Sequence, residues 1–395
     1  MEFNQLDTQK WDGKHVLVRL DLNVPVKNGT VLDDSRIKAA LPTIKYLLSQ
    51  NAKIALMSHL GRPKGTKVPE LSLAPVGERL AELLHCEVFL VGDFDKEPAD
   101  QLLRQLGKNQ VLLYENLRFY PGETSNDLDF AHLLSKGADY YVNDAFGAVH
   151  RAHASVVAVP SQFPSDKRFA GTLIQKEISA LSQLKKHPKA PFTAIVGGAK
   201  VSDKIGVILS LINRCNDLLI GGAMAYTLLK FKGFQVGSSR VEEDKMELCD
   251  SIFRSAQARK VTIHLPEDHI CADRFDENAE PRVISDYNIP DGLMGLDIGP
   301  KTLEKYRSVI RGSETVLWNG PVGVFEWDSF AKGSLGIATE MSHCRGYTVI
   351  GGGESVAAAV RAGVEDNISH VSTGGGASLE FLEGLTLPGL KAISL

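Results

Sequence analysis

The chain has 395 residues, a length that predicts two or three domains of ordinary size, and we expect two. Hydrophobic residues make up 43% and charged residues 23%, as in globular proteins, and no apolar run approaches the roughly 18 residues that a membrane-spanning helix needs. The formal net charge of -4 argues against a general binder of nucleic acids or anionic membranes.

Short apolar runs alternate with stretches of helical periodicity along the whole chain. Nearly continuous apolar runs are typical of parallel strands that are buried on both faces. The expected strands are His15–Leu20, Lys53–Met57, Glu87–Val91, Val111–Tyr114, Tyr140–Val142, Phe192–Val196, Asp217–Ile220, Thr262–Leu265, Thr315–Trp318, Tyr347–Ile350 and His370–Ser372. The pattern predicts an α/β fold of two Rossmann-like, doubly wound parallel-sheet domains.

The domain boundary is expected between the fifth and sixth strands. Gln175–Leu181 has a helical pattern, and the charged, proline-containing segment Lys185–Pro191 ends it. We therefore expect a first domain over residues 1–170, a hinge helix and linker over 171–189, and a second domain over 190–379. Alternatively, this helix is one more connection within a single large sheet.

In the first half, polar and basic residues follow the strands. Asp21–Asn23, Ser58–Gly65 and Glu115–Arg118 stand directly after three strands, and Arg36 and Arg151 lie close to strand ends. Because ligands of parallel sheets bind beyond the carboxyl ends of the strands, this pattern predicts a site for a small, highly anionic ligand. Scattered surface salt bridges are the alternative explanation.

In the second half, glycines follow the strands. The clusters are Gly197–Lys200, Gly221–Met224, Gly351–Ser355 and Thr373–Ser378, and Lys204 lies one helical turn after Lys200. Glycines let a backbone approach phosphates closely, and helix N-termini offer free N–H groups, so the pattern favours a nucleotide site. Alternatively, the glycines serve only tight turns.

Other motifs are absent or incomplete. The chain has no G-x-x-x-x-G-K-[ST] sequence, and its histidines form no H-E-x-x-H pattern, so neither a P-loop nor a zinc site is expected. Gly351-x-Gly353-x-x-Val356 lacks the third glycine of a dinucleotide fingerprint. Five dispersed cysteines and an N-terminus without a signal-peptide pattern favour a reduced, cytoplasmic protein.

With these motifs in this order, the chain resembles the phosphoglycerate kinase family over essentially its full length. The resemblance rests on His15–Pro25, Ser58–Gly65, Glu115–Tyr120, Asn143–Phe146, His150–His153, Gly197–Lys204, Trp318–Glu326 and Ser372–Glu380. It implies reversible phosphoryl transfer from 1,3-bisphosphoglycerate to MgADP by a monomer with an interdomain cleft. It also implies that residues 380–395 return to the first domain as a tail.

The resemblance further implies the residues that contact each substrate. Those for the glycerate are Asp21, Leu22, Asn23, Arg36, His59, Leu60, Gly61, Arg62, Arg118 and Arg151. Those for ADP or ATP are Gly198, Lys200, Lys204, Gly222, Gly295, Asn319, Glu326, Gly352, Gly353, Glu354 and Ser355. Arg36, Lys200 and Lys204 are expected to be catalytic, with no general base, because the acceptor carboxylate is already ionised near neutral pH.

Two positions depart from the family's pattern. Glu354 replaces the usual aspartate that meets Mg²⁺, and Ala223 replaces a third glycine after Gly222. Both changes bear on the geometry of metal and nucleotide. Two other functions stay open at this point: a nicotinamide-dependent dehydrogenase that uses Gly351–Val356, and a non-catalytic anion-binding or scaffold protein. No nucleic-acid or membrane partner is expected.

Overall fold

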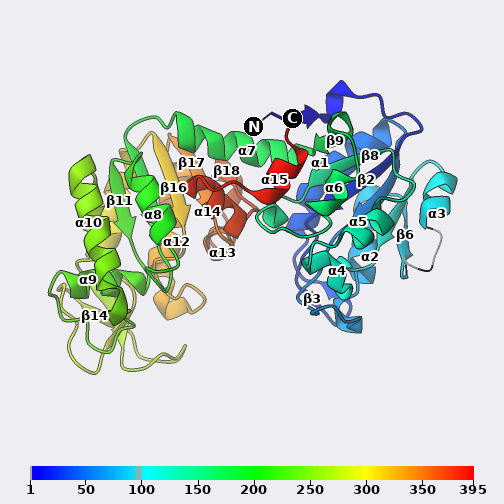
Figure 1. Cartoon of the computed structure of the whole chain (residues 1–395). Coiled ribbons are helices and arrows are strands. Elements are labelled where there is room, and N and C mark those ends of the chain that lie inside the picture. Colours follow the sequence, from blue (N-terminus) through cyan, green and yellow to red (C-terminus); the bar gives the residue numbers. More distant parts are fainter. Residues whose placement is uncertain (1, 94–95, 97–98) are drawn as a thin grey trace. The chain divides into compact units, whose positions relative to one another are not determined.

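The computed structural model describes residues 2–93, 96 and 99–395. The chain divides into two compact units (Figure 1): the residues up to Ser179 together with Thr386–Leu395, and Ala180–Leu385. The dividing point lies in helix α7 (Thr172–Lys186), inside the linker expected over 171–189. Residues 380–385 belong to the second unit, whereas the sequence analysis counted them in the returning tail.

The first unit is built on a seven-stranded sheet in which all neighbouring strands are parallel. Its order is β1 (Asn4–Gln5), β9 (Arg168–Ala170), β8 (Tyr140–Asp144), β2 (His15–Leu20), β5 (Lys53–Met57), β7 (Gln110–Tyr114) and β6 (Glu87–Val91). The helices are α1 (Ser35–Ser49), α2 (Ala74–Leu84), α3 (Ala99–Gln105), α4 (Pro121–Thr124), α5 (Leu128–Ser135) and α6 (Ala158–Ser161).

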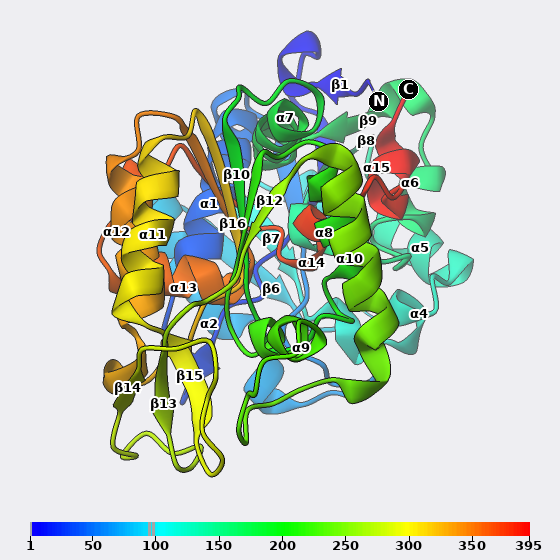
Figure 2. The ribbon, with the colours of Figure 1, turned by 90° about the vertical axis from the view of Figure 1, so that its left-hand side faces the viewer.

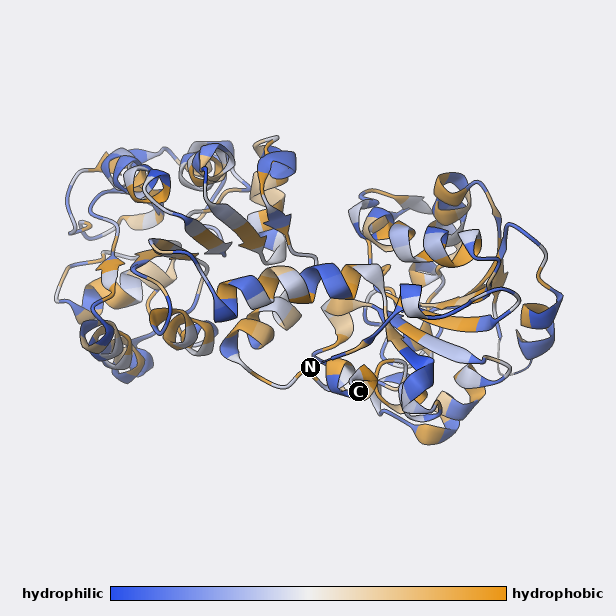
Figure 3. Cartoon of the chain, turned by 90° about the horizontal axis from the view of Figure 1, so that it is seen from above, coloured by the Kyte–Doolittle hydropathy of each residue, from blue (hydrophilic) through white to orange (hydrophobic). Residues whose placement is uncertain are grey.

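Helix α1 shows how the sequence pattern produces the packing of this unit. Ile37, Ala40, Ile44 and Leu47 recur at spacings of three and four, and all four side chains are buried. They join a core with β2 and β5 residues. Figure 3 shows the resulting pattern throughout the chain, because most helices carry both hydrophobic and hydrophilic colour.

The second unit is built on a six-stranded parallel sheet. Its order is β12 (Thr262–His264), β11 (Asp217–Ile220), β10 (Phe192–Val196), β16 (Thr315–Asn319), β17 (Tyr347–Gly351) and β18 (His370–Val371). The helices are α8 (Ile205–Ile212), α9 (Met224–Phe231), α10 (Met246–Arg259), α11 (Pro300–Arg311), α12 (Lys332–His343), α13 (Gly353–Arg361) and α14 (Gly376–Glu383). Helices α11 and α12 cover one face of the sheet, and α8 and α10 cover the other (Figure 2).

These two sheets confirm the predicted fold class, and all eleven expected strands are present. The sequence analysis did not predict a small antiparallel sheet in the second unit, of order β14 (Arg282–Ile284), β13 (His269–Ala272) and β15 (Met294–Ile298). It also missed the short strands β1 and β9, and the two-residue hairpin β3 (Val26–Lys27) and β4 (Thr30–Val31).

The C-terminal segment is bound to the first unit by helix α15 (Pro388–Ile393). The Gly389 N–H donates to the Val149 carbonyl at 2.8 Å, and Arg168 Nη1 donates to the Ala392 carbonyl at 3.2 Å. The Leu395 N–H donates to the Glu2 carbonyl at 3.0 Å. The two ends of the chain therefore lie together on one unit.

Helix α7 begins at a buried carboxylate. Asp144 Oδ1 accepts from the N–H groups of Leu173 and Ile174 at 2.8 and 3.1 Å, while Asp144 Oδ2 has no hydrogen-bond partner within the described residues. Burial raises the pKa of Asp144 from 3.8 to about 7. The folded chain therefore holds this proton more tightly than the unfolded chain does.

This raised pKa predicts how stability depends on pH. The contribution of Asp144 is complete below about pH 4 and is lost as the pH rises through about 7. Asp144→Asn keeps an acceptor at Oδ1 and cannot ionise. Its free energy of unfolding, relative to the wild type, should therefore rise between about pH 4 and 8 in denaturant titrations. Asp127→Asn, at the surface cap of α5, is the control; parallel pH curves for Asp144→Asn and the wild type would contradict the prediction.

Candidate active site

In the first unit, hydrogen bonds join the predicted substrate residues at the carboxyl edge of the sheet. Arg36 Nη1 donates to Asp21 Oδ2 at 2.9 Å. The Gly61 N–H donates to Asn23 Oδ1 at 2.9 Å, and Arg118 Nη1 donates to the Gly61 carbonyl at 2.7 Å. The turns after β2, β5 and β7 therefore form one connected surface, which we call the arginine edge.

Positive charge is crowded at the arginine edge. Burial, together with Arg151 and Arg19, lowers the pKa of Arg118 to about 10. Burial, together with Arg118 and Arg19, lowers the pKa of His153 to about 4, and burial and Arg19 lower that of His59 well below its ordinary value. The neighbouring arginines disfavour the charged forms of these groups, and this arginine-rich edge is therefore suited to an anionic ligand.

The other predicted residues of this edge play different roles. Leu22 and Leu60 have buried side chains, and their N–H groups donate to Ser58 Oγ at 2.9 Å and Asn116 Oδ1 at 3.1 Å, so they shape the turns. Arg62 is exposed and makes no hydrogen bond or ion pair in the described part of the chain. Its side chain is thus available to a ligand.

In the second unit, backbone groups of the predicted glycine turns bond directly to one another. The N–H groups of Gly197 and Gly198 donate to the carbonyls of Asn319 and Pro321, both at 3.0 Å. The Gly222 N–H donates to the Val322 carbonyl at 2.9 Å. The turns after β10, β11 and β16 are thereby fixed against each other, and we call this surface the glycine edge.

Asn319 connects these turns to the start of α13. The Lys204 ammonium donates to Asn319 Oδ1, and Asn319 Nδ2 donates to the Gly351 carbonyl at 2.8 Å. Ser355 Oγ accepts from the Gly320 N–H at 2.6 Å. Asn319 and Ser355 therefore position the glycine turn that precedes α13, and Lys204, whose pKa burial lowers, is held beside it.

A cavity of about 510 Å³ opens at the glycine edge. The predicted residues Gly198, Gly222, Gly295, Glu326 and Glu354 line it. Sequence reasoning missed its largely apolar walls, which include Tyr226, Phe275, Met294, Leu296, Val322 and Val324. A cavity with apolar walls and few polar groups is suited to the base of a nucleotide.

A second hollow of about 190 Å³ lies beside Lys204. The predicted residues Asn319, Gly352, Gly353, Glu354 and Ser355 line it together with Lys204. Gly375, Gly376 and Leu379 also line it; the sequence analysis counted Thr373–Ser378 among the clusters that favour a nucleotide site but named none of these residues as a contact. Helices α13 and α14 both begin here, so their N-terminal N–H groups favour an anion. Lys200 lines neither cavity.

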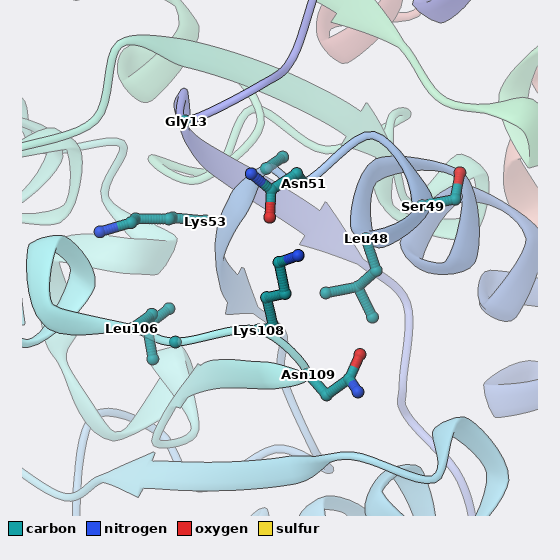
Figure 4. Close-up of a pocket in the computed structure, with 10 residues that line it drawn as sticks. Gly13, Leu48, Ser49, Asn51, Lys53, Leu106, Lys108 and Asn109 are labelled. Atoms are coloured by element: carbon teal, nitrogen blue, oxygen red, sulfur yellow. The ribbon is translucent and has the colours of Figure 1, made fainter.

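A third pocket, of about 460 Å³, lies at the opposite, amino edge of the first sheet (Figure 4). Asn51, Lys53, Lys108 and Asn109 contribute polar side chains to it, beside Leu48 and Leu106. The Lys53 ammonium already donates to the Arg104 carbonyl. This pocket has none of the predicted site residues.

The chain is similar to known proteins over nearly its whole length. The family model described as "Phosphoglycerate kinase" matches residues 6–385. The chain is 51% identical to a phosphoglycerate kinase of Anaeromyxobacter dehalogenans (strain 2CP-C) over 395 residues, covering 99% of each chain, and 47% identical to that of Borreliella burgdorferi over 387 residues, covering 98% of each. The solved phosphoglycerate kinase of Coxiella burnetii matches with a TM-score of 0.88 and 36% identity over 99% of each chain. That of Pyrococcus horikoshii matches with a TM-score of 0.83 and 32% identity over 98% of each.

Within the described residues, we find no helix with the length and hydropathy of a membrane span.

Proposed function

The chain belongs to the phosphoglycerate kinase family, and from this premise we propose that its arginine edge and glycine edge are the two substrate sites of the family's reaction. The enzyme transfers a phosphoryl group reversibly from 1,3-bisphosphoglycerate to MgADP, giving 3-phosphoglycerate and MgATP in glycolysis. The observation that carries the assignment is the division of the two kinds of group: crowded cations in one unit, and glycine turns at helix N-termini in the other.

We assign the glycerate to the arginine edge. Arg36 and Arg118 are oriented by Asp21 and the Gly61 carbonyl, so their remaining N–H groups can bind phosphate or carboxylate oxygens. Arg62 and Arg151 add donors from neighbouring turns. We assign His59 as a hydrogen-bond donor to the substrate and not as a base. Its pKa lies well below the ordinary value, so the imidazole is a weak base.

We assign the nucleotide to the glycine edge. The larger cavity takes the base between its apolar walls, with Glu326 as a polar group for the sugar. The smaller hollow takes phosphate oxygens, with Lys204 and the N-terminus of α13 as donors. Gly375 and Gly376, from the predicted glycine cluster Thr373–Ser378, line the same hollow and are assigned to the phosphates with it.

Phosphoryl transfer needs charge stabilisation and alignment more than covalent help from the protein. Arg36 from the first unit and Lys200 and Lys204 from the second are proposed to stabilise the charge on the transferring group. The acceptor carboxylate of 3-phosphoglycerate is already ionised near neutral pH, so no side chain has to remove a proton. Neither unit alone has both sets of groups, and catalysis therefore requires the whole chain.

The residues present fit Mg²⁺ bound mainly by the nucleotide. Within the described residues, no group of three or more His, Cys, Asp or Glu side chains could hold a metal. Mg²⁺ is commonly held by one or two carboxylates together with substrate phosphates and water. Glu354, in the first turn of α13, lines both cavities and is the carboxylate that would hold it. When bound, Mg²⁺ neutralises phosphate charge during the transfer.

Glu354→Gln tests this metal assignment, because it removes the charge and keeps the size of the side chain. We expect a higher Mg²⁺ requirement and a lower kcat, measured by Mg²⁺ titration of the steady-state rate, with an almost unchanged Tm without ligand. Glu354→Asp should keep most of the activity.

Glu247→Gln is the matched control, since Glu247 lies in the first turn of α10 and lines neither cavity. If Glu354 served only the helix dipole, its loss would cost roughly 0.3–1 kcal/mol of stability. In that case the Mg²⁺ titration would not move, and the metal assignment would be wrong.

The proposed function is tested by a coupled assay for ATP formation from 1,3-bisphosphoglycerate and ADP, with and without Mg²⁺. We expect Mg²⁺-dependent ATP formation and no reduction of NAD with a hydroxy acid. Reduction of NAD without ATP formation would favour the dehydrogenase alternative instead.

We also propose that the enzyme is a cytoplasmic monomer; the support is its five unpaired cysteines and the presence of both sets of groups in one chain.

A further inference from the structure

Arg19 is a fully buried arginine that lies beside the arginine edge and has no role in the assignments above. It stands on β2, and its guanidinium donates in three directions. Nε donates to Ser155 Oγ at 2.7 Å, Nη1 donates to the Leu20 carbonyl, and Nη2 lies 3.0 Å from Nδ1 of His59. A buried guanidinium with three partners has a fixed orientation.

Ser155, the partner of Arg19 Nε, is itself held in place by hydrogen bonds to Glu123. Ser155 Oγ donates to Glu123 Oε1 at 2.6 Å, and the Ser155 N–H donates to Glu123 Oε2 at 2.9 Å. Glu123 and Ser155 are themselves fully buried. The hydrogen bonds therefore run in one direction, from Arg19 through Ser155 to the carboxylate of Glu123, and Arg19 cannot turn away from His59 without breaking this chain.

The contact with His59 decides where the imidazole carries its proton. A guanidinium only donates hydrogen bonds, so Nδ1 of His59 must accept. The ring is neutral, because burial and the charges of Arg19, Arg118, Arg36 and His153 all lower its pKa. A neutral imidazole has one N–H group, which must then be at Nε2. Within the described residues, Nε2 has no hydrogen-bond partner.

We propose that Arg19 is a positioning residue that holds His59 in its Nε2–H tautomer, so that His59 donates from Nε2 to an oxygen of the bound glycerate substrate. The proposal rests on the assignment of the glycerate to the arginine edge. Without Arg19, the imidazole would exchange between tautomers, and only part of the population would present a donor. Arg19 therefore prepares the site before the substrate arrives.

The tautomer can be measured in the full-length enzyme without substrate, by ¹⁵N NMR of the histidine side chains. We expect His59 to show a protonated Nε2 and an unprotonated Nδ1, and Arg19→Met to show a mixture of tautomers or the Nδ1–H form. Tyr141→Phe is the control. It removes another buried hydrogen bond to Ser155, from the Tyr141 hydroxyl to the carbonyl, and does not touch His59. A protonated Nδ1 in the wild type would overturn the proposal, whatever the activity of the enzyme.

A second pair of variants avoids any folding defect of Arg19→Met. The amide nitrogen of glutamine reaches about as far as imidazole Nε2, and that of asparagine about as far as Nδ1. His59→Gln should therefore keep a KM for 3-phosphoglycerate near that of the wild type. His59→Asn should raise it by about 10- to 100-fold, the cost of one hydrogen bond to a charged group, with a smaller change in kcat. The reverse order would overturn the tautomer assignment, whereas an inactive wild type would overturn the proposed function instead.

Discussion

Replacing Arg36 with alanine is expected to lower kcat by about 10²- to 10³-fold, because the change removes a charged donor that we assign to the transferring phosphoryl group. Arg36 Nη1 lies 2.9 Å from Asp21 Oδ2, and 35% of the side chain is exposed, so the guanidinium is oriented and still open to a ligand. The KM for MgADP should change much less, since the nucleotide is assigned to the other unit. Steady-state kinetics in both directions measure these constants.

Arg311→Ala is the matched control for this experiment. Arg311 also forms an ion pair, with Nε at 2.7 Å from Glu340 Oε1, but it lies on the surface of the second unit away from both cavities. Exposed ion pairs contribute at most about 1 kcal/mol to folding stability. Because Arg311 also lies away from both cavities, kcat should stay close to that of the wild type. A similarly small change in Arg36→Ala would exclude Arg36 from the catalytic role.

Gly222→Ala is expected to damage both the stability and the nucleotide affinity of the second unit. Gly222 has a φ of +70°, and a Cβ atom there would lie 2.6 Å from the backbone N and O atoms of Gly198. Two backbone turns would have to separate. Backbone strain and overpacking each cost about 1–3 kcal/mol, so we expect a loss of about 2–6 kcal/mol in the free energy of unfolding. Affinity for MgADP should fall sharply, because the turn lines the larger cavity.

Gly233→Ala separates the two causes. Gly233 has a φ of +91°, but a Cβ atom there would meet nothing within 4 Å. This variant should therefore lose only the strain contribution, about 1–3 kcal/mol, and should bind MgADP as the wild type does. Denaturant titration and calorimetry measure both properties. If Gly222→Ala were no less stable than Gly233→Ala, the turns would be less rigid than their hydrogen bonds indicate.

The central strands were predictable because they are buried on both faces, as β10 and β16 are along their full lengths. Such strands are continuous apolar runs that no turn residue interrupts. The strand ends then predicted both edges, since parallel strands bring their carboxyl ends together. Thus Asp21, Gly61 and Arg118, which lie far apart in the sequence, are neighbours in one hydrogen-bonded surface.

The antiparallel sheet was not predictable in the same way, because its strands are short and β14 is largely exposed. The walls of the larger cavity that Phe275 and Met294 provide were missed for this reason. Arg19 was missed for another reason: it stands inside a strand, and only the structure shows that its side chain reaches His59. Chain order alone contains no signal for such a contact.

The central claim is that the glycerate binds the arginine edge of one unit and the nucleotide binds the glycine edge of the other. Amide hydrogen exchange of the full-length wild type, with each ligand added separately, tests it most directly. We predict that 3-phosphoglycerate protects the turns Ser58–Gly65 and Glu115–Tyr120, and that MgADP protects Gly197–Lys204 and Gly351–Ser355. Protection of the glycine turns by 3-phosphoglycerate, with the arginine edge unchanged, would contradict the account.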